Sequence, residues 1–377
     1  MRWAWAEIDL DAIAHNVAVV RGIVAPSAVW AVVKADAYGH GAVAVARAAL
    51  MAGADGLCVA LVEEGIALRK AGIVAPILLL SEQPAEQADE IVAFDLQPTV
   101  TSLEGIAALV LAARSNTGKA PVDVHLKLDT GMHRVGADLG FAVGMVQAIS
   151  DHDELQLASI FTHLAMADEP AAPANELQIH RFDAALAEVR SAGYDVPIVH
   201  IANSAAALAL GDARRDVVRL GIAMYGIEPG PGVADLCTGL RPALSLHARV
   251  SAVKTVVGGE GVSYGLRHRF DRDTLVATIP IGYADGVPRR LFSTGGEVLI
   301  HGVRRPIVGV VTMDQLMVDC GDLAVAVGDE VILIGGQIGA AGQDAIPAEE
   351  WAARLGTIGY EIVCGISKRI TRRPAHS

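Results

Sequence analysis

The sequence predicts an α/β protein, with an N-terminal (β/α)8 TIM-like barrel followed by a C-terminal β-rich domain. Two observations predict it. Up to residue 220, short apolar, β-branched runs alternate with amphipathic or alanine-rich stretches, as in parallel strands alternating with helices. After a stretch rich in glycine and proline at 228–232, apolar and polar residues alternate between glycine-containing turns, which indicates strands joined as hairpins.

Eight runs predict the strands of the barrel, and helical patterns lie between them. The predicted strands are 29–34, 56–60, 77–80, 96–100, 122–128, 157–162, 198–202 and 217–220. The clearest helical patterns are 42–51, 102–113, 176–191 and 204–210. Eight strands that are each followed by a helical stretch are typical of a barrel whose functional groups lie at the carboxyl ends of the strands.

The second domain is predicted from four alternating runs and one late helix. The runs are 244–257, 274–281, 297–303 and 308–319, and the helix is 348–355. The linker around 229–240 is the best boundary. We therefore predict a barrel domain over 1–234, whose first residues can associate with the other domain, and a β-domain over 235–377.

Composition excludes several classes of protein. Of the 377 residues 30 are basic and 43 acidic, a net charge of -13 that disfavours nucleic acids and anionic membranes as partners. Four widely spaced cysteines fit neither a disulfide framework nor a zinc site, and no metal is expected. Acidic residues occupy the N-terminus where a signal peptide needs an apolar core, and no apolar run is long enough to span a bilayer. The expected location is the cytoplasm.

A lysine at the end of the first barrel strand is the strongest chemical signal. Lys34 follows a buried apolar run and precedes Tyr38 and two glycines. A lysine that loses its charge by burial becomes a nucleophilic amine, as Schiff-base chemistry requires. An ordinary surface lysine is the simpler interpretation of Lys34 alone. It becomes less favoured because polar residues recur at the other strand ends: Lys127 with Asp129, His163, Asn203 with Ser204, and Arg219 with Gly221.

The last two strand ends predict a phosphate site. Ser204 begins the helix after the seventh strand, and Gly221 and Ile222 follow the eighth without bulky polar groups. Loops after these two strands often bind phosphate in barrels, although Ser204 alone is explained as a helix cap. A phosphate site beside a strand-end lysine indicates pyridoxal 5'-phosphate bound to Lys34.

Lys127 is predicted to point into the barrel. His125, Lys127 and Asp129 share one face of their strand, while Leu126 and Leu128 share the apolar face that meets the helices. A buried lysine is costly unless it is paired or chemically altered. Both an ion pair with Asp129 and a modified Lys127 remain open.

Along nearly its whole length the chain resembles alanine racemase. In the barrel the matching segments are 33–41 (VKADAYGHG), 127–134 (KLDTGMHR), 203–204 and 219–226 (RLGIAMYG). In the β-domain they are 262–265 (VSYG), 280–286 (PIGYADG) and 313–315 (MDQ). The resemblance implies a pyridoxal-phosphate-dependent isomerase that interconverts L-alanine and D-alanine for peptidoglycan synthesis. It also implies a homodimer whose active sites are shared between the subunits.

The resemblance implies a role for each site residue. Lys34 would bind the cofactor and move the Cα proton of one enantiomer, and Tyr264 of the other subunit would serve the opposite enantiomer. Arg219 would face the pyridine nitrogen, and His163 would assist Tyr264. Arg134 and Met313 would bind the substrate, and Lys127 would carry a carbamate that orients Arg134. The remaining cofactor-binding residues would be Tyr38, Asn203, Ser204, Gly221, Ile222 and Tyr360.

Two positions depart from the family pattern, and other functions stay open. Asp36 stands where asparagine is common. Val310 stands where the family often has an arginine that lines the entry corridor and with which Asp168 could have paired. A racemase that accepts both alanine and serine is the main alternative. A barrel-type decarboxylase would need glycine-rich stretches that the chain lacks, and a non-catalytic cofactor carrier would lack the second domain. A Schiff-base aldolase without cofactor would be colourless.

Overall fold

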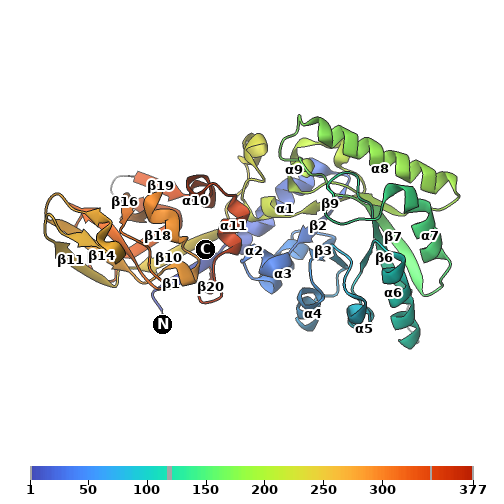
Figure 1. The fold of residues 1–377 in the computed structure, drawn as a ribbon, viewed down its shortest axis with the longest axis horizontal. Helices are drawn as coiled ribbons and strands as arrows, with labels where there is room; N and C mark the ends of the chain where they lie inside the picture. Colours follow the sequence, from blue (N-terminus) through green and yellow to red (C-terminus); the bar gives the residue numbers. More distant parts are fainter. Residues whose placement is uncertain (1, 117–120, 340–341, 376–377) are drawn as a thin grey trace. The chain divides into compact units, whose positions relative to one another are not determined.

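The computed structural model describes residues 2–116, 121–339 and 342–375 (Figure 1). These residues form two compact units. One unit, here called the β-unit, comprises Met1–Ala12, Tyr38–His40 and Arg241–Ser377. The other, the barrel unit, comprises Ile13–Ala37 and Gly41–Leu240. The domain boundary between residues 234 and 235 stays a prediction. The β-unit also includes segments from the N-terminal part of the chain.

The predicted barrel is confirmed by eight parallel strands. They are β2 (Ala28–Val32), β3 (Gly56–Val59), β4 (Ile77–Leu79), β5 (Thr99–Val100), β6 (Val122–Lys127), β7 (Leu155–Phe161), β8 (Ile198–His200) and β9 (Val217–Leu220). They form two four-stranded sheets, in the orders β4-β3-β2-β9 and β5-β6-β7-β8. Backbone hydrogen bonds join the sheets at both seams, from Gln97 N to Ile77 O (2.9 Å) and from Arg219 N to Ala202 O (3.0 Å). The sheets therefore close into one barrel.

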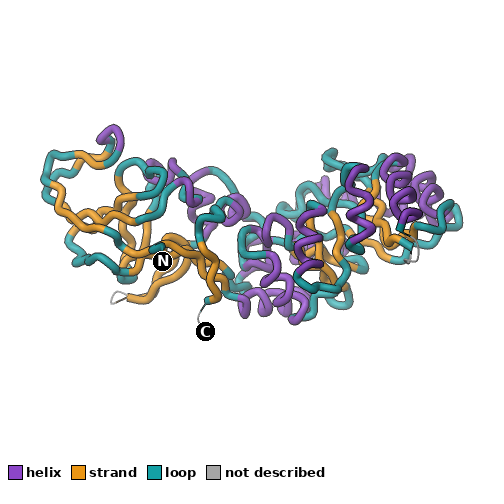
Figure 2. Tube along the Cα trace, turned by 90° about the horizontal axis from the view of Figure 1, so that it is seen from below, coloured by secondary structure: helices purple, strands orange, loops and turns teal. Residues whose placement is uncertain are grey.

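Helices surround the strands of the barrel unit (Figures 1 and 2). They are α1 (Leu10–Val24), α3 (Ala42–Met51), α4 (Val62–Lys70), α5 (Ala88–Ala93), α6 (Leu103–Ser115), α7 (Ala142–Ser150), α8 (Pro173–Ser191) and α9 (Ser204–Ala209). In α6, the Ser102 hydroxyl accepts a hydrogen bond from Gly105 N, and Ile106, Leu109 and Val110 are buried on one face. Amphipathic helices of this kind cover a barrel whose strands are buried on both faces. Among the described residues, no helix combines the length and apolar character needed to cross a lipid bilayer.

The barrel differs from the prediction in two places. The strand expected over 96–100 is reduced to β5, Thr99–Val100, because Pro98 has no N–H to donate to a neighbouring strand. The stretch after β9 is not an α-helix but a short 3-10 turn, η4 (Ile222–Tyr225). This turn begins one residue after Gly221, so the chain folds back directly after the end of β9.

The β-unit is built on one mixed sheet of ten strands. The strands are β1 (Ala4–Ile8), β10 (Leu244–Arg249), β11 (Ala252–Val256), β14 (Thr274–Ile279), β15 (Glu297–Ile300), β16 (Val303–Val308), β17 (Leu316–Gly321), β18 (Glu330–Gly339), β19 (Gly342–Ile346) and β20 (Thr371–Pro374). The β12–β13 hairpin (Gly261–Val262 and His268–Arg269) and the helices α10 (Ala348–Leu355) and α11 (Gly359–Cys364) complete the unit. The helix predicted over 348–355 is confirmed.

Three runs predicted as single strands are interrupted by turns. Residues 244–257 divide into β10 and β11, and 297–303 turns at His301 and Gly302, whose φ values are 54° and 73°. Residues 308–319 are broken at Gly309, with φ of 65°, so that β16 ends at Val308 and β17 begins at Leu316. Positive φ ends a strand, since it turns the backbone out of the extended region.

A buried carboxylate anchors the β-unit. The Asp285 side chain is fully buried. It accepts hydrogen bonds from Arg2 (2.7 and 2.5 Å) and from Gly282 N (3.0 Å), and it lies 3.3 Å from Arg369 Nε. The arrangement ties the N-terminus and the segment after β14 to the C-terminal segment. A buried carboxylate needs such partners, because desolvation penalises its charge.

Asp285→Asn is expected to lower the free energy of unfolding by about 2–4 kcal/mol, since it leaves Arg2 and Arg369 without their shared acceptor. The lower half of that range is favoured because both arginines are partly exposed. Asp314→Asn is the matched control: its carboxylate also pairs with Arg369 (2.6 Å) but is 57% exposed. Urea denaturation of the two variants measures the difference. Equal stability of the two variants would contradict an anchoring role.

Candidate active site

Lys34 lies at the start of a left-handed turn. β2 ends at Val32, and the turn α2 (Lys34–Tyr38) has φ values of 52–54° at Ala35, Asp36, Ala37 and Tyr38. Four successive non-glycine residues in this region are strained, each by about 1 kcal/mol or more. Two carboxylates hold the turn: Glu64 accepts from Ala35 N (2.6 Å) and Asp36 accepts from Ala42 N (2.8 Å). Asp36, which departs from the family pattern, therefore satisfies an N–H at the start of α3.

Arg219 is a buried cation of the barrel unit with four hydrogen-bond partners. Its side chain is buried in β9 and donates from NH2 to the carbonyl oxygens of Thr162 (2.8 Å) and Ile201 (2.9 Å). It also donates to the ring nitrogens His163 Nδ1 (3.1 Å) and His200 Nδ1 (2.7 Å). Burial lowers the pKa of Arg219 to about 10, so it remains charged at neutral pH. Its guanidinium is therefore a fixed donor.

Lys127, the last residue of β6, points across the barrel as predicted. It is 5% exposed, its Nζ donates to Leu80 O (3.1 Å), and it lies 5.3 Å from the centroid of the Phe161 ring. Burial lowers the pKa of Lys127 to about 7, helped by the charges of Arg219, Arg134 and Lys34. Much of the Lys127 amine is therefore uncharged at neutral pH.

Asp129 is engaged elsewhere, which weakens the prediction of an ion pair with Lys127. Its Oδ1 accepts from Gly131 N (2.9 Å) and His133 N (3.1 Å), and its Oδ2 lies 3.4 Å from His133 Nδ1. Although burial raises the pKa of Asp129, these backbone donors hold it below its usual range. Asp129 thus shapes the loop that carries Arg134. Arg134 is exposed, and its charge acts on Lys127 and His163 at the same end of the barrel.

His163 is a neutral imidazole among cations. Its Nδ1 accepts from Arg219, and its Nε2 lies 3.5 Å from Asn203 Nδ2. Burial, followed by the charges of Arg219, Lys127, Arg134 and Lys34, holds the pKa of His163 well below its usual value. Arg219 only donates, so Nδ1 accepts in the shorter of these two contacts. The Asn203 amide nitrogen that faces Nε2 is a donor too, so this tautomer leaves the Nε2 contact without a hydrogen bond.

The predicted phosphate-binding residues also meet. The buried Ser204 Oγ accepts from Gly221 N (2.8 Å) and Ala223 N (3.3 Å), on either side of Ile222. Asn203 caps the same helix, α9, by accepting from Ala206 N (3.0 Å). The Ser204 hydroxyl thus joins the start of α9 to the turn after β9. We call this site, formed by Asn203, Ser204 and the Gly221–Ile222 backbone, the polar corner.

Four of the predicted residues belong to the β-unit. The rings of Tyr38 and Tyr360 lie with their centroids 6.0 Å apart. Tyr264 is 73% exposed in the connection between β12 and β13, and Met313 is 52% exposed. The carbonyl oxygen of Val310, the second departure from the family pattern, accepts from Ser263 Oγ (2.6 Å) and so fixes the residue before Tyr264. The predicted residues are therefore divided between the two units, and in the β-unit the structure pairs Tyr38 with Tyr360.

Comparison with known proteins decides the family. The family model for the N-terminal domain of alanine racemase matches residues 8–229, and that for the C-terminal domain matches 243–374. Alanine racemase of Symbiobacterium thermophilum is 46% identical over 373 residues, which cover 99% of this chain and 97% of the relative. That of Mycobacterium ulcerans is 45% identical, covering 98% and 94%. The crystal structure of alanine racemase from Bacillus anthracis with bound L-Ala-P has a TM-score of 0.92 at 39% identity, covering 100% of this chain and 96% of that one.

The chain belongs to the alanine racemase family. The resemblance seen in the sequence is thereby confirmed, as is the class of fold, a barrel with a β-rich second domain. The individual site residues stay predictions, supported by the contacts described above.

Several residues around Arg219 escaped the sequence prediction. His200, the last residue of β8, and Ser159 in β7 are buried beside the predicted site, and His125 was placed on its strand face but given no role. The signal that could have found them is a polar residue within a strand whose neighbours are all apolar. Such a residue needs a partner inside the barrel.

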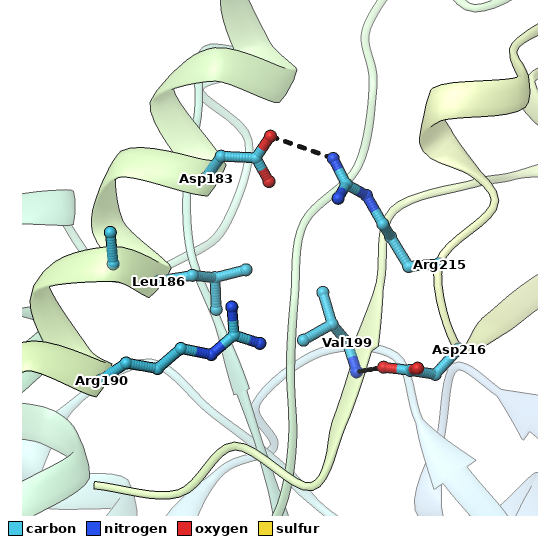
Figure 3. Close-up of a pocket in the computed structure, with 7 residues that line it drawn as sticks. Asp183, Leu186, Arg190, Val199, Arg215 and Asp216 are labelled. Carbon is cyan, nitrogen blue, oxygen red and sulfur yellow. Dashed lines mark hydrogen bonds and ion pairs between the residues drawn. The ribbon is translucent and has the colours of Figure 1, made fainter. Parts of the chain in front are cut away.

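A cavity of about 380 Å³ lies near the amino-terminal ends of β8 and β9, at the end of the barrel opposite the candidate site (Figure 3). Between α8 and the start of β9, Arg215 pairs with Asp183 (3.0 Å), and Asp216 accepts from Val199 N (2.7 Å). These contacts join α8 to the amino-terminal ends of β8 and β9. In a barrel this end serves stability, whereas chemistry is located at the carboxyl ends of the strands. The cavity is therefore separate from the candidate site.

Proposed function

We propose that this protein is an alanine racemase that interconverts L-alanine and D-alanine with pyridoxal 5'-phosphate as cofactor. The observation that carries the proposal is the gathering of Arg219, Lys127, Arg134 and Lys34 around a neutral His163 at one end of the barrel. The two arginines of this group keep their charge, and they suit a ligand that bears a phosphate and a carboxylate. Full-length similarity to alanine racemases supports the same reaction.

The residues present fit this cofactor. Lys34 supplies an amine, Ser204 and the Gly221–Ile222 backbone supply a polar corner for the phosphate, and Arg219 supplies a permanent donor for the pyridine nitrogen. When bound, pyridoxal phosphate withdraws electrons from the α-carbon of an amino acid and so acidifies its hydrogen. Arg219 donates a hydrogen bond without giving up its proton, which limits this withdrawal and disfavours side reactions.

Racemisation needs one proton-transferring group on each face of a planar α-carbon. We assign the Nζ of Lys34 to one face and the phenol oxygen of Tyr264, supplied by the partner subunit, to the other. His163, held by Arg219, would assist Tyr264 as a proton-transferring group, because the phenol of free tyrosine has a pKa of about 10. Arg134 and Met313 would position the substrate, and Tyr38, Asn203 and Tyr360 would position the cofactor. The enzyme would then be a cytoplasmic homodimer supplying D-alanine for peptidoglycan.

The test is a circular-dichroism assay of the purified, cofactor-loaded protein. L-alanine and D-alanine should each lose optical activity towards the same end point, without release of carbon dioxide. L-serine, run in parallel, decides between a strict and a broad racemase. Borohydride reduction should fix the cofactor on Lys34, which peptide mapping detects. Carbon dioxide release or a label on another lysine would overturn the assignment.

We also propose that Lys127 carries a carbamate. The nitrogen of its uncharged amine can attack the carbon of carbon dioxide, so that an N–C bond forms, the electron pair of one C=O π bond moves to oxygen and nitrogen releases one proton to solvent. The anion formed would face Arg134. Since the pKa of the bare amine is about 7, the reaction is favoured above pH 7 and reversed as the pH falls below it. Lys70, over the ring of Phe94 at 5.7 Å but exposed, is the matched control.

With carbon-13 bicarbonate, NMR should show one carbamate carbon that disappears below about pH 7 and is absent in Lys127→Ala. Lys127→Ala should lose most activity and regain part of it with acetate, whereas Lys70→Ala should behave as wild type. Full activity with an unmodified Lys127 would refute the carbamate.

A further inference from the structure

A continuous chain of hydrogen bonds runs from Arg219 through the inside of the barrel. Its bonds are Arg219 NH1 to His200 Nδ1 (2.7 Å), His200 Nε2 to Ser159 Oγ (2.8 Å), Ser159 Oγ to His125 Nδ1 (2.6 Å), His125 Nε2 to Gln97 Oε1 (3.2 Å) and Gln97 Nε2 to Asp123 Oδ2 (3.0 Å). Arg219, His200, Ser159 and His125 are at most 3% exposed. Gln97 and Asp123 are half-buried and line a cavity of about 400 Å³.

The two ends of this chain fix the direction of every bond. A guanidinium has only donors, so His200 Nδ1 must accept and its Nε2 must carry the hydrogen. Ser159 accepts that hydrogen and passes its own to His125 Nδ1, which makes His125 an Nε2–H donor as well. Gln97 then receives this hydrogen on its oxygen and donates its amide hydrogen to the carboxylate, which can only accept.

Burial keeps both imidazoles of the chain neutral. Desolvation lowers the pKa of His125 to about 3, and desolvation followed by the charge of Arg219 lowers that of His200 well below its usual value. A second proton on either ring would break one of the bonds described. Aromatic rings pack against the chain: Phe161 of β7 stacks on His200 with centroids 4.5 Å apart, and Trp30 of β2 meets His125 edge-on at 5.6 Å. The chain is therefore held rigid by packing as well as by hydrogen bonds.

We propose that Asp123 is the remote end of a positioning device for Arg219. Through Gln97, His125, Ser159 and His200, the Asp123 carboxylate keeps the lone pair of His200 Nδ1 directed at the guanidinium. The direction of Arg219 NH1 is thereby fixed. The device rests on the proposed function, because Arg219 acts there as the donor to the cofactor. Bonds aligned in one direction polarise one another, so a charge at one end strengthens the bond at the other. Asp123 and the four residues between are positioning residues and touch neither substrate nor cofactor.

The first test measures which imidazole nitrogens of the hydrogen-bond chain are protonated, and it does not depend on an activity assay. Holoenzyme labelled with nitrogen-15 histidine should show His200 and His125 as neutral rings protonated at Nε2. The signals are assigned from those missing in His200→Asn and His125→Asn. A ring protonated at Nδ1 in either residue would overturn the proposed direction, whatever the enzyme catalyses.

The second test removes the acceptor at the remote end. In Asp123→Asn the new side chain can present either an oxygen or an NH2 group, so Gln97 is free to turn over. We expect His125 to show a mixture of both tautomers. We also expect kcat for L-alanine to fall roughly three- to tenfold with KM within about twofold, as for the loss of one hydrogen bond to a charged group.

Asp95→Asn is the control, because Asp95 lines the same cavity, is 94% exposed and takes no part in the chain. It should leave the His125 signal and kcat unchanged. Loss of kcat in both variants to the same extent would point to net charge and refute the device. An unchanged His125 tautomer in Asp123→Asn would also refute it. If the protein were not a racemase, the tautomers would still be as described, so the two proposals fail separately.

Discussion

Lys34→Ala and Tyr264→Phe are each expected to lower racemase activity by about 10²–10⁴-fold, yet a mixture of the two should regain about a quarter of wild-type activity. Each variant alone lacks one of the two proton-transferring groups in every active site. If Tyr264 serves the partner's Lys34, a mixed dimer has one site with both lesions and one site with neither. Random exchange makes about half the dimers mixed, and half the sites in these are intact.

The exposure of Tyr264 in a single chain is consistent with this arrangement. Its side chain is 73% exposed at the tip of the β12–β13 hairpin, beside the strained residues Ser263 and Leu266 with φ of 64° and 46°. An exposed tyrosine held by an ordered turn suits insertion into another subunit. The recovery is measured by circular dichroism after the two variants are mixed and subunit exchange is confirmed by mass spectrometry.

Tyr194→Phe serves as the control for loss of a phenol group. Tyr194 is half-buried in the barrel unit, outside the candidate site, and its replacement should leave activity unchanged. If Tyr264 served its own subunit, every site of a mixed dimer would carry one lesion and activity would not recover. That result, with exchange demonstrated, would contradict the shared site.

Arg219→Lys should lower kcat by about a hundredfold while leaving the cofactor attached to Lys34. The substitution preserves the charge but not the geometry. NH2 of Arg219 reaches two carbonyl oxygens and His163, and NH1 reaches His200, whereas a lysine offers three hydrogens from a single nitrogen. At least one of the four acceptors then loses its donor, at a cost of about 1–3 kcal/mol.

Arg214→Lys is the matched control. Arg214 also donates to three carbonyl oxygens, those of Ala207, Leu208 and Ile23, but it lies away from the candidate site. It should lower stability without lowering kcat of the folded enzyme. Absorption spectra and borohydride mapping check that Arg219→Lys still holds the cofactor. Near-normal kcat in Arg219→Lys would show that charge alone suffices.

The barrel could be predicted because its strands are buried on both faces. Runs such as 122–128 and 217–220 are continuous enough in apolar and β-branched residues to mark strands, and their final polar residues mark one end of the barrel. Lys127 and Arg219 were found in this way. Strand limits were less predictable, since Pro98 and Gly309 decide them through backbone geometry rather than hydrophobicity.

Other features depend on contacts between distant parts of the chain. The bond from Arg219 to His200 joins residues of different strands, and Ser159 lies between two histidines that are 75 positions apart in sequence. The apolar neighbours of Ser159 indicate that it needs a partner, but they do not indicate that its partners are His125 and His200. The roles of Tyr264 and Tyr360 came from the family resemblance, because an exposed hairpin tyrosine has no chemical signature of its own.

The left-handed turn after Lys34 makes the most recognisable segment of the sequence dependent on its surroundings. Alanine, aspartate and tyrosine do not adopt such a turn unaided, and Glu64 of α4 is among the residues that hold it. A synthetic peptide of residues 28–52 would therefore not present its lysine as the enzyme does. Moving the segment into another barrel would require Glu64 to move with it. The geometry of this lysine is thus specified by tertiary contacts and not by the local sequence alone.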